Sequence, residues 1–406
     1  MKNLADHDSF VDGVPHDTFA QMRADHPVHW TEAHGGQKGF WSLTRYADIM
    51  AAQKEPTVFS SAQGIRIEDQ SREEYLARRT FQETDPPEHT VTRRAVNPVF
   101  AKPVVAQFEP LIRDLACDIV AEALRQPEFD AVDKIAKRLP MLMLGRILGV
   151  PDADLDWLVD RGDALIGNTD PDFTNTVIDK VDTQAYRMMP FRSPAGVELY
   201  DYAEEILNGA RGIDETGILA RVLRAEDGAI TGQEFKNFFC LLVAAGNDTT
   251  RYSIAMALHL LTQQNGLLET LQSGEVWETC ADEFIRLASP TLHFRRTATR
   301  DVEMHGQTIR TGDKVLMWFV SGSRDEAVFD DPHLARLDRS PNRHLAFGQG
   351  GPHVCLGMWL AKLELKCVLQ ELAARITRLE VVDSPTWTRS NFICGVKSLT
   401  ARPSLK

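Results

Sequence analysis

The sequence lacks several features that would place the protein in other functional classes. No apolar run is long enough to cross a bilayer, and the first ten residues have neither the basic nor the apolar region of a secretory signal. Basic residues are outnumbered by acidic ones, and the formal net charge is −13. This charge disfavours nucleic acid and anionic membranes as partners. We therefore expect a cytoplasmic protein with no membrane anchor and no nucleic-acid partner.

Cysteine is scarce and scattered. No two cysteines have the CxxC spacing of a zinc or redox site, and the CxxCH motif of covalent haem attachment is absent. This pattern argues against a disulfide framework and predicts small core residues at most of these positions. The six cysteines are Cys117, Cys240, Cys280, Cys355, Cys367 and Cys394.

Helical periodicity dominates the chain. No repeat or Gly/Ser linker divides it, so we expect a single domain over residues 1–406 with a mainly α (α+β) fold. Thr231 and Glu234 predict a capping box at the start of the long central helix. The predicted helices are 104–124, 139–148, 233–264, 275–288 and 357–376, and the predicted strands are 39–43, 302–304, 307–309 and 314–318.

The most informative segment surrounds Cys355. Residues 347–357 read Phe-Gly-Gln-Gly-Gly-Pro-His-Val-Cys-Leu-Gly and directly precede a predicted helix. Backbone N–H groups in such a glycine-rich turn, together with the helix dipole, stabilise a thiolate that binds a metal. The alternative interpretation is a turn with an inert, buried cysteine.

This segment resembles the cysteine-ligand signature of cytochromes P450. The stretch from Phe347 to Cys355 is one residue longer than the commonest form, and is similar to that of bacterial members that oxidise sterol side chains, terpenoids or other lipids. The resemblance implies the P450 fold, in which a large helical domain and small β-sheets enclose a buried haem b. It also implies that Cys355 is the iron ligand and that Phe347 and Gly348 belong to the haem site.

A second motif lies inside the long central helix, where residues 244–250 read Ala-Ala-Gly-Asn-Asp-Thr-Thr. A glycine and an Asp-Thr pair within a buried helix cost stability, and a hydroxyl that bonds back to the previous turn opens space beside the helix. A solvent-facing polar stripe is the alternative. The stretch resembles the oxygen-activating motif of the same family, which implies that Thr249 positions a water and that Asp248 relays protons.

Further motifs follow the family order. Residues 85–94 resemble the family's HxxxR helix and residues 294–298 resemble a strand motif. The resemblance implies that His89, Arg93, Arg296 and His353 bind the haem propionates. Glu283 and Arg286 form an ExxR motif, for which the family supplies a later third partner, here Arg343 or His344.

The resemblance also implies a substrate pocket above the haem. Its expected lining is apolar, which predicts a hydrophobic small-molecule substrate that is terpenoid, sterol or lipid-like. The predicted lining residues are Leu241, Ala244, Ala245, Leu292, Phe294, Phe392 and Ile393.

Electrons are expected from a ferredoxin and its reductase, because the chain contains no flavin or iron–sulfur domain. Basic residues could form the docking face for that partner, and the family likeness favours a monomer. The candidate docking residues are Arg66, Arg72, Arg78, Arg79, Lys102, Arg343 and Lys362.

The reaction expected from the resemblance is hydroxylation, with one atom of dioxygen inserted into the substrate. Two alternatives remain open. One is a haem-thiolate peroxygenase, dehydratase or isomerase of a biosynthetic pathway, although the retention of Asp248 and Thr249 favours oxygen activation. The other is a haem-binding protein without turnover.

Overall fold

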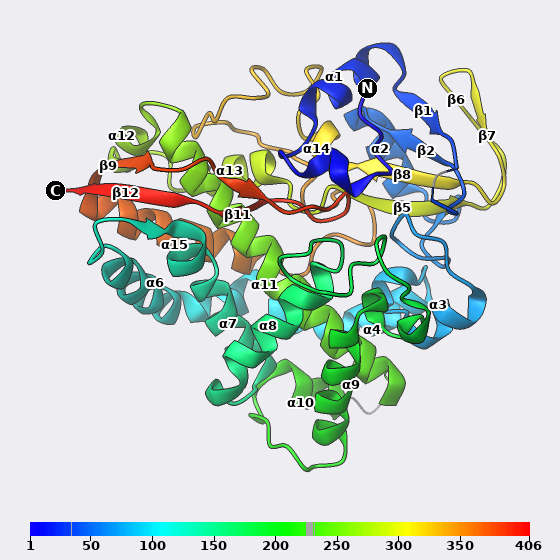
Figure 1. Ribbon diagram of the computed structural model, residues 1–406, viewed down its shortest axis with the longest axis horizontal. Coiled ribbons are helices and arrows are strands. Elements are labelled where there is room, and N and C mark those ends of the chain that lie inside the picture. The colour runs from blue at the N-terminus through cyan, green and yellow to red at the C-terminus, as the bar shows by residue number, and fades with distance from the viewer. Residues whose placement is uncertain (34, 225–229, 231) are drawn as a thin grey trace.

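The computed structural model describes the whole chain except residues 34, 225–229 and 231 (Figure 1). Helices are the most abundant regular structure, and a sheet of five strands lies toward one end. Fifteen α-helices are present in the described part: α1 His16–Asp25, α2 Tyr46–Lys54, α3 Arg72–Arg78, α4 Glu88–Val96, α5 Lys102–Val105, α6 Glu109–Ala123, α7 Arg138–Leu148, α8 Leu155–Ile166, α9 Pro194–Leu207, α10 Ile218–Leu223, α11 Gly232–Gln263, α12 Leu267–Gln272, α13 Cys280–Ala288, α14 Phe319–Gly322 and α15 Met358–Arg375.

The strands are short and form four small sheets. The largest has the order β1-β2-β8-β5-β3, in which only β2 and β8 pair in parallel. The other sheets are β4-β12-β9, β10-β11 and β6-β7. The strands are β1 Val28–Thr31, β2 Phe40–Leu43, β3 Phe59–Ser60, β4 Phe129–Asp130, β5 His293–Ala298, β6 Val302–Met304, β7 Gln307–Ile309, β8 Lys314–Trp318, β9 Ile376–Val381, β10 Thr386–Trp387, β11 Val396–Ser398 and β12 Thr400–Leu405.

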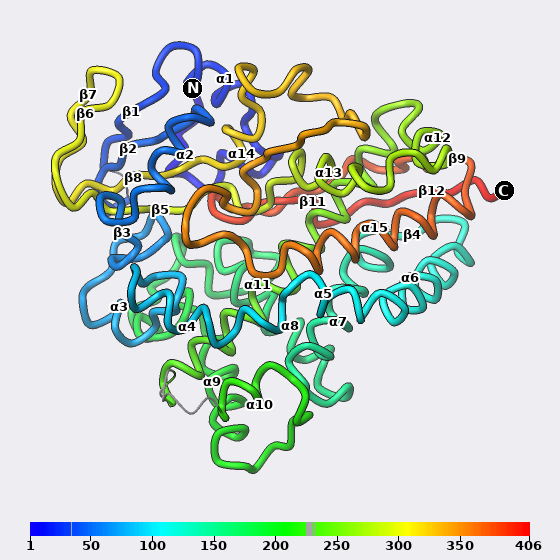
Figure 2. The backbone as a smooth tube through the Cα atoms, turned by 180° about the vertical axis from the view of Figure 1, so that it is seen from behind, coloured from blue at the N-terminus to red at the C-terminus, as the bar shows by residue number. Residues whose placement is uncertain are grey.

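The helix α11 is the central element of the helical region. It packs against α7, α8 and α9 on one side and against α13 and α15 on the other. Helix α15 also packs along α6, and Figure 2 shows these two helices side by side. Because α11 has neighbours on several sides, its sequence is apolar on more than one face, as expected for a helix inside a core.

Gly246 allows α7 to approach α11 closely. A Cβ atom at this position would lie 2.7 Å from Cδ1 of Leu144, so a larger residue would force the two helices apart. Both residues line the same internal pocket. The glycine inside α11 is therefore explained by helix packing at the pocket wall.

The structure confirms most of the elements predicted from the sequence, with shifted ends. The predicted helix 104–124 is divided, because Pro110 lacks an N–H group and occupies the first turn of α6, which begins at Glu109. The predicted helix 275–288 begins only at Cys280. Thr231, the predicted cap of the central helix, lies outside the described residues. None of the helices in the described ranges is long and apolar enough to span a membrane.

Candidate active site

An internal pocket lies between α11, the cysteine loop, strand β5 and the C-terminal loop. Its wall brings together residues that are separated by more than 300 positions in the sequence, such as Arg66 and Phe392. Most of the predicted site residues line it: Arg93, Leu241, Ala244, Ala245, Thr249, Phe294, Phe347, Gly348, His353, Cys355, Phe392 and Ile393.

Leu292 is an exception, and its prediction as a pocket residue is wrong. Its side chain is fully buried in a separate core cluster that contains Phe10 and Trp318. Thr291 lines the pocket in its place, where it forms a β-bridge with Ile393. Strand β5 begins at His293, so the alternation that places Phe294 in the pocket does not extend back to Leu292.

The cysteine loop folds back toward α15. Gly348 and Gly350 have φ values of +66° and +105°, and the N–H of Cys355 donates to the carbonyl of Phe347 at 2.9 Å. A Cβ atom on Gly351 would lie 2.2 Å from the carbonyl oxygen of Gln53 in α2, so this position requires glycine. The loop is thereby held tightly against α2.

Cys355 lines the pocket and has exposed surface there, although protein atoms crowd around its sulfur. Burial raises the pKa of this thiol, while the backbone N–H groups of Gly357 and Met358 act in the opposite direction. These two amides lie at the start of α15, where the helix dipole also favours a negative charge. The one-residue-longer loop therefore still directs helix-terminal amides at the sulfur.

Four basic side chains gather beside the cysteine loop. The rings of His89 and His353 lie 4.2 Å apart, and Arg93 donates to the carbonyl of Val354. The pKa of His89 falls to about 4, because of burial and the nearby charges of Arg93 and Arg296. The pKa of His353 falls to about 2 for the same reasons.

Apart from Asp85, the described part of the chain places no carboxylate beside this basic cluster. Both ring nitrogens of His89 are buried without a hydrogen-bond partner among the residues that the structure describes, and burial lowers the pKa of Arg296 to about 10. Asp85 is the carboxylate that opposes this shift, but it already accepts from Ser60 and from the backbone of Ser61. A cluster of this kind suits a bound anion.

Thr249 and Asp248 point in different directions from α11. The hydroxyl of Thr249 donates to the carbonyl of Ala245 at 2.9 Å, and the residue lines the pocket. Asp248 does not line the pocket but forms an ion pair with Arg251, one helical turn along α11. Burial raises the pKa of the Asp248 carboxyl, and the nearby Asp163 adds to the effect.

A charged chain connects Asp248 with the protein surface. Arg251 also binds Asp163 of α8 at 2.7 Å, and Asp163 binds the ammonium group of Lys137 at 2.9 Å. The side chain of Lys137 is 25% exposed, so it is the solvent end of this chain. The arrangement links solvent to the carboxyl beside Thr249 through charged groups.

The chain was compared with known families, sequences and structures. The Cytochrome P450 family model matches residues 268–375. Linalool 8-monooxygenase of Pseudomonas putida is 33% identical over 98% of this chain and 97% of its own length, and a steroid C26-monooxygenase of Mycolicibacterium smegmatis is 31% identical over 95% and 90%. A crystal structure of a Mycobacterium marinum cytochrome P450 in complex with pseudoionone superposes with a TM-score of 0.85 at 31% identity, covering 95% of this chain and 94% of that one.

The chain belongs to the cytochrome P450 family. The predicted P450 fold is therefore confirmed, and the protein is a cytochrome P450 monooxygenase whose cofactor is haem b. The residues around the pocket fit that cofactor, because Cys355, Arg93 and His353 line one cavity, and His89 and Arg296 lie beside them with few partners of their own in the described part of the chain. Haem b has an iron that accepts a thiolate and two propionates that require cations.

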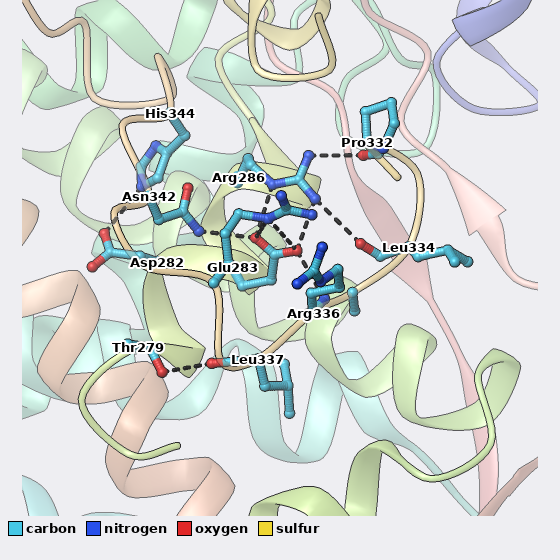
Figure 3. A network of polar contacts seen from close by, with 12 residues as sticks. Thr279, Asp282, Glu283, Arg286, Pro332, Leu334, Arg336, Leu337, Asn342 and His344 are labelled. Atoms are coloured by element: carbon cyan, nitrogen blue, oxygen red, sulfur yellow. Dashed lines mark hydrogen bonds and ion pairs between the residues drawn. The ribbon is translucent and has the colours of Figure 1, made fainter. Parts of the chain in front are cut away.

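The ExxR motif of this P450 forms a dense polar network with residues of the segment 332–344 (Figure 3). Glu283 and Arg286 are fully buried and joined by two hydrogen bonds of 2.9 and 2.8 Å. The carboxylate of Glu283 also accepts from Asn342 and from the backbone N–H of Arg336. Arg286 donates further to the carbonyls of Ser323, Pro332 and Leu334.

The third partner of the ExxR pair differs from the prediction. Arg339 binds Glu283 at 3.1 Å, whereas His344 binds the neighbouring Asp282 and the side chain of Arg343 is exposed. His344 instead contacts the ring of Phe347, which begins the cysteine loop. The sequence places several cations after the motif, and only the path of the loop decides which of them reaches Glu283.

Other residues of the site carry no local sequence signal. Asp163 and Arg251 lie in ordinary helical patterns, although Arg251 is three residues after Asp248 and so on the same face of α11. Arg66 and Arg78, predicted for a docking face, line the pocket instead, so that prediction is wrong for these two residues. Basic residues in an irregular segment are more often exposed, and only the folded path of residues 64–83 places them inside.

Proposed function

We propose that this P450 hydroxylates a hydrophobic small molecule that is terpenoid, sterol or lipid-like, using electrons from a ferredoxin and its reductase. The observation that supports the proposal most strongly is that Thr249 and Cys355 lie on the wall of one pocket, with Asp248 behind Thr249. Haem b, when bound through the sulfur of Cys355, supplies the activation of dioxygen.

In this proposal the basic cluster orients the cofactor. His89, Arg93, Arg296 and His353 bind the propionates, which supply the negative charge that the cluster lacks. Phe347 and Gly348 contact the haem from the cysteine loop. The amides of Gly357 and Met358 keep the sulfur anionic.

Protons reach the pocket along α11. Hydroxylation consumes two protons for each dioxygen, and Asp248 has the raised pKa of a group that exchanges protons near neutral pH. Lys137 and Asp163 connect Asp248 with solvent, and the hydroxyl of Thr249 holds a water at the pocket wall. The apolar side chains of Leu241, Ala244, Ala245, Phe294, Phe392 and Ile393 bind the substrate and exclude other water.

The electron donor is proposed to dock near the cysteine loop. The ammonium nitrogens of Lys102 and Lys362 lie 4.7 and 5.1 Å from the ring centre of Trp359, close to the start of α15. Arg343, which precedes the cysteine loop in the sequence, is exposed. These cations suit an acidic ferredoxin. The single domain, the monomeric state and the cytoplasmic location stay predictions from the sequence.

Coupling measurements test the proton relay. In Thr249→Ala we expect oxygen consumption to continue while the fraction of electrons that appear in hydroxylated product falls about tenfold. Thr262→Ala is the matched control, because that hydroxyl also bonds back to its own helix but lies outside the pocket. Equal coupling in both variants would remove Thr249 from the relay.

The electron requirement separates the alternatives. The proposal expects turnover with reduced ferredoxin and dioxygen. Efficient turnover with peroxide alone would favour a peroxygenase. Turnover with neither an oxidant nor a reductant would favour a dehydratase or isomerase. Ligand binding without any turnover would favour a haem-binding protein.

A further inference from the structure

One wall of the pocket carries an arginine whose hydrogen-bonding groups are unused. Arg66 lines the pocket, and its guanidinium carbon lies 4.3 Å from the ring centre of Phe191 and 5.9 Å from that of Phe392. Within the described ranges, its side chain donates no hydrogen bond, although guanidinium has five N–H donors. The two rings hold the group in place while its donors remain free.

Glu68 lies beside Arg66 and has a carboxylate oxygen that accepts no hydrogen bond in the described part of the chain. Its Oε2 lies 3.7 Å from Nε of Arg66, too far for a hydrogen bond, and this oxygen is buried without a partner in the described part of the chain. Burial acts to raise the pKa of Glu68, but the charge of Arg66 and a backbone N–H hold it at about 2. The carboxylate is therefore ionised at neutral pH.

The other charged groups on this part of the wall already have partners. Arg78 donates through Nε and Nη2 to Gln70 and through Nη1 to the carbonyl of Arg187. Glu83 accepts from the backbone N–H of Thr80. Arg66 and Glu68 thus form a neutral pair on the wall of a mainly apolar pocket, with free donors on Arg66 and a Glu68 side chain that is 17% exposed.

We infer that Arg66 and Glu68 bind a hydroxyl group, so that the substrate is an apolar alcohol. A hydroxyl is both a donor and an acceptor, and it satisfies both members of the pair. A carbonyl would leave Glu68 without a donor, a carboxylate would be repelled by Glu68, and a hydrocarbon would leave both groups unpaired in a poorly solvated site. The inference rests on the proposed function, because it assigns the substrate class to the same pocket.

Calorimetric titration of the holoenzyme with two matched ligand series tests this inference. One series is limonene, perillyl alcohol and perillic acid, and the other is dodecane, dodecanol and dodecanoic acid. Each series keeps one skeleton and changes only the polar group. In at least one series we expect the alcohol to bind about tenfold more tightly than both the hydrocarbon and the acid, as a hydrogen bond to a charged group predicts.

Variants assign the effect to the pair. Arg66→Met should weaken binding of that alcohol about tenfold and that of the hydrocarbon less than twofold, and Glu68→Gln should weaken the alcohol in the same sense. Arg72→Met is the matched control, because Arg72 is exposed on α3 and stacks on Tyr75 outside the pocket. It should leave all affinities unchanged.

Several outcomes would overturn the inference. They are tighter binding of an acid than of its alcohol, no preference for either alcohol, or equal weakening of alcohol and hydrocarbon in Arg66→Met, which would indicate packing alone. Product analysis separates this failure from failure of the proposed function. If the enzyme hydroxylates hydrocarbon and alcohol equally well, only the hydroxyl anchor is wrong. An iron without a sulfur ligand would refute the proposed function, and calorimetry would still test the anchor.

Discussion

Two buried clusters of ionisable residues near the cysteine loop differ in whether their hydrogen-bonding groups find partners within the chain. In the first, all three nitrogens of the Arg286 guanidinium donate hydrogen bonds, and Glu283 accepts from several donors. In the second, Arg93 and Arg296 lie beside two histidines, and neither ring nitrogen of His89 has a partner in the described part of the chain. The first cluster is complete within the chain, whereas we propose that an anion from outside the chain completes the second.

The difference shows how structural and ligand-binding charges are distinguished. A buried charge costs stability unless it is paired, so a cluster saturated by its own chain supports the fold. A cluster that stays unsaturated beside a pocket requires a ligand that brings the missing charge. The pair of Arg66 and Glu68 belongs to this second kind, although its net charge is zero.

Breaking the saturated cluster should have the largest effect. Arg286→Met leaves Glu283 buried with fewer partners, and we expect the free energy of unfolding of the holoenzyme to fall by about 3–5 kcal/mol in urea. Arg378→Met is the control, because that guanidinium is 71% exposed in its ion pair with Glu380 and should cost less than about 1 kcal/mol. Equal effects of the two changes would contradict the structural role of the network.

Breaking the unsaturated cluster should affect haem retention more than folding. Arg296→Met removes a cation that we assign to a propionate, and we expect haem transfer to apomyoglobin to show about tenfold weaker binding. Arg295→Met is a neighbouring control on β5, since Arg295 binds the carbonyl of Glu68 and the hydroxyl of Thr297 instead. Haem retention that falls equally in both variants would argue against the propionate assignment.

The sequence predicted the parts of this site that a local pattern encodes. The glycine-rich segment before Cys355 and the Asp-Thr pair of α11 are contiguous, and the structure places both segments at one pocket. The prediction was wrong for Leu292 because it extended a strand alternation beyond the end of β5. It missed Arg339 and Asp163 because long-range pairing depends on the path of the chain and leaves no periodic signal.

A third kind of buried titratable group carries no charge. Glu364 of α15 is 1% exposed, and its Oε2 has no partner in the described part of the chain. Burial alone raises the pKa of this carboxyl from 4.5 to about 8. The group avoids the cost of a buried charge by staying protonated.

The pH dependence of Glu364→Gln tests this interpretation. The folded-state pKa exceeds the unfolded value, so the wild type loses stability as pH rises from about 4.5 to 8, by up to about 1.4 kcal/mol per pH unit. Glutamine resembles the protonated form and does not titrate. We therefore expect thermal unfolding of Glu364→Gln and wild type to match at pH 5 and the variant to be more stable at pH 8, and parallel pH profiles would contradict the raised pKa.

X-ray absorption at the iron edge of the purified holoenzyme tests the central claim most directly, which is that the sulfur of Cys355 binds the haem iron. We expect a sulfur neighbour of the iron in the wild type and in Cys117→Ala, and its loss in Cys355→Ala. A sulfur ligand that persists in Cys355→Ala, or an iron bound only by nitrogen and oxygen in the active wild type, would contradict the claim.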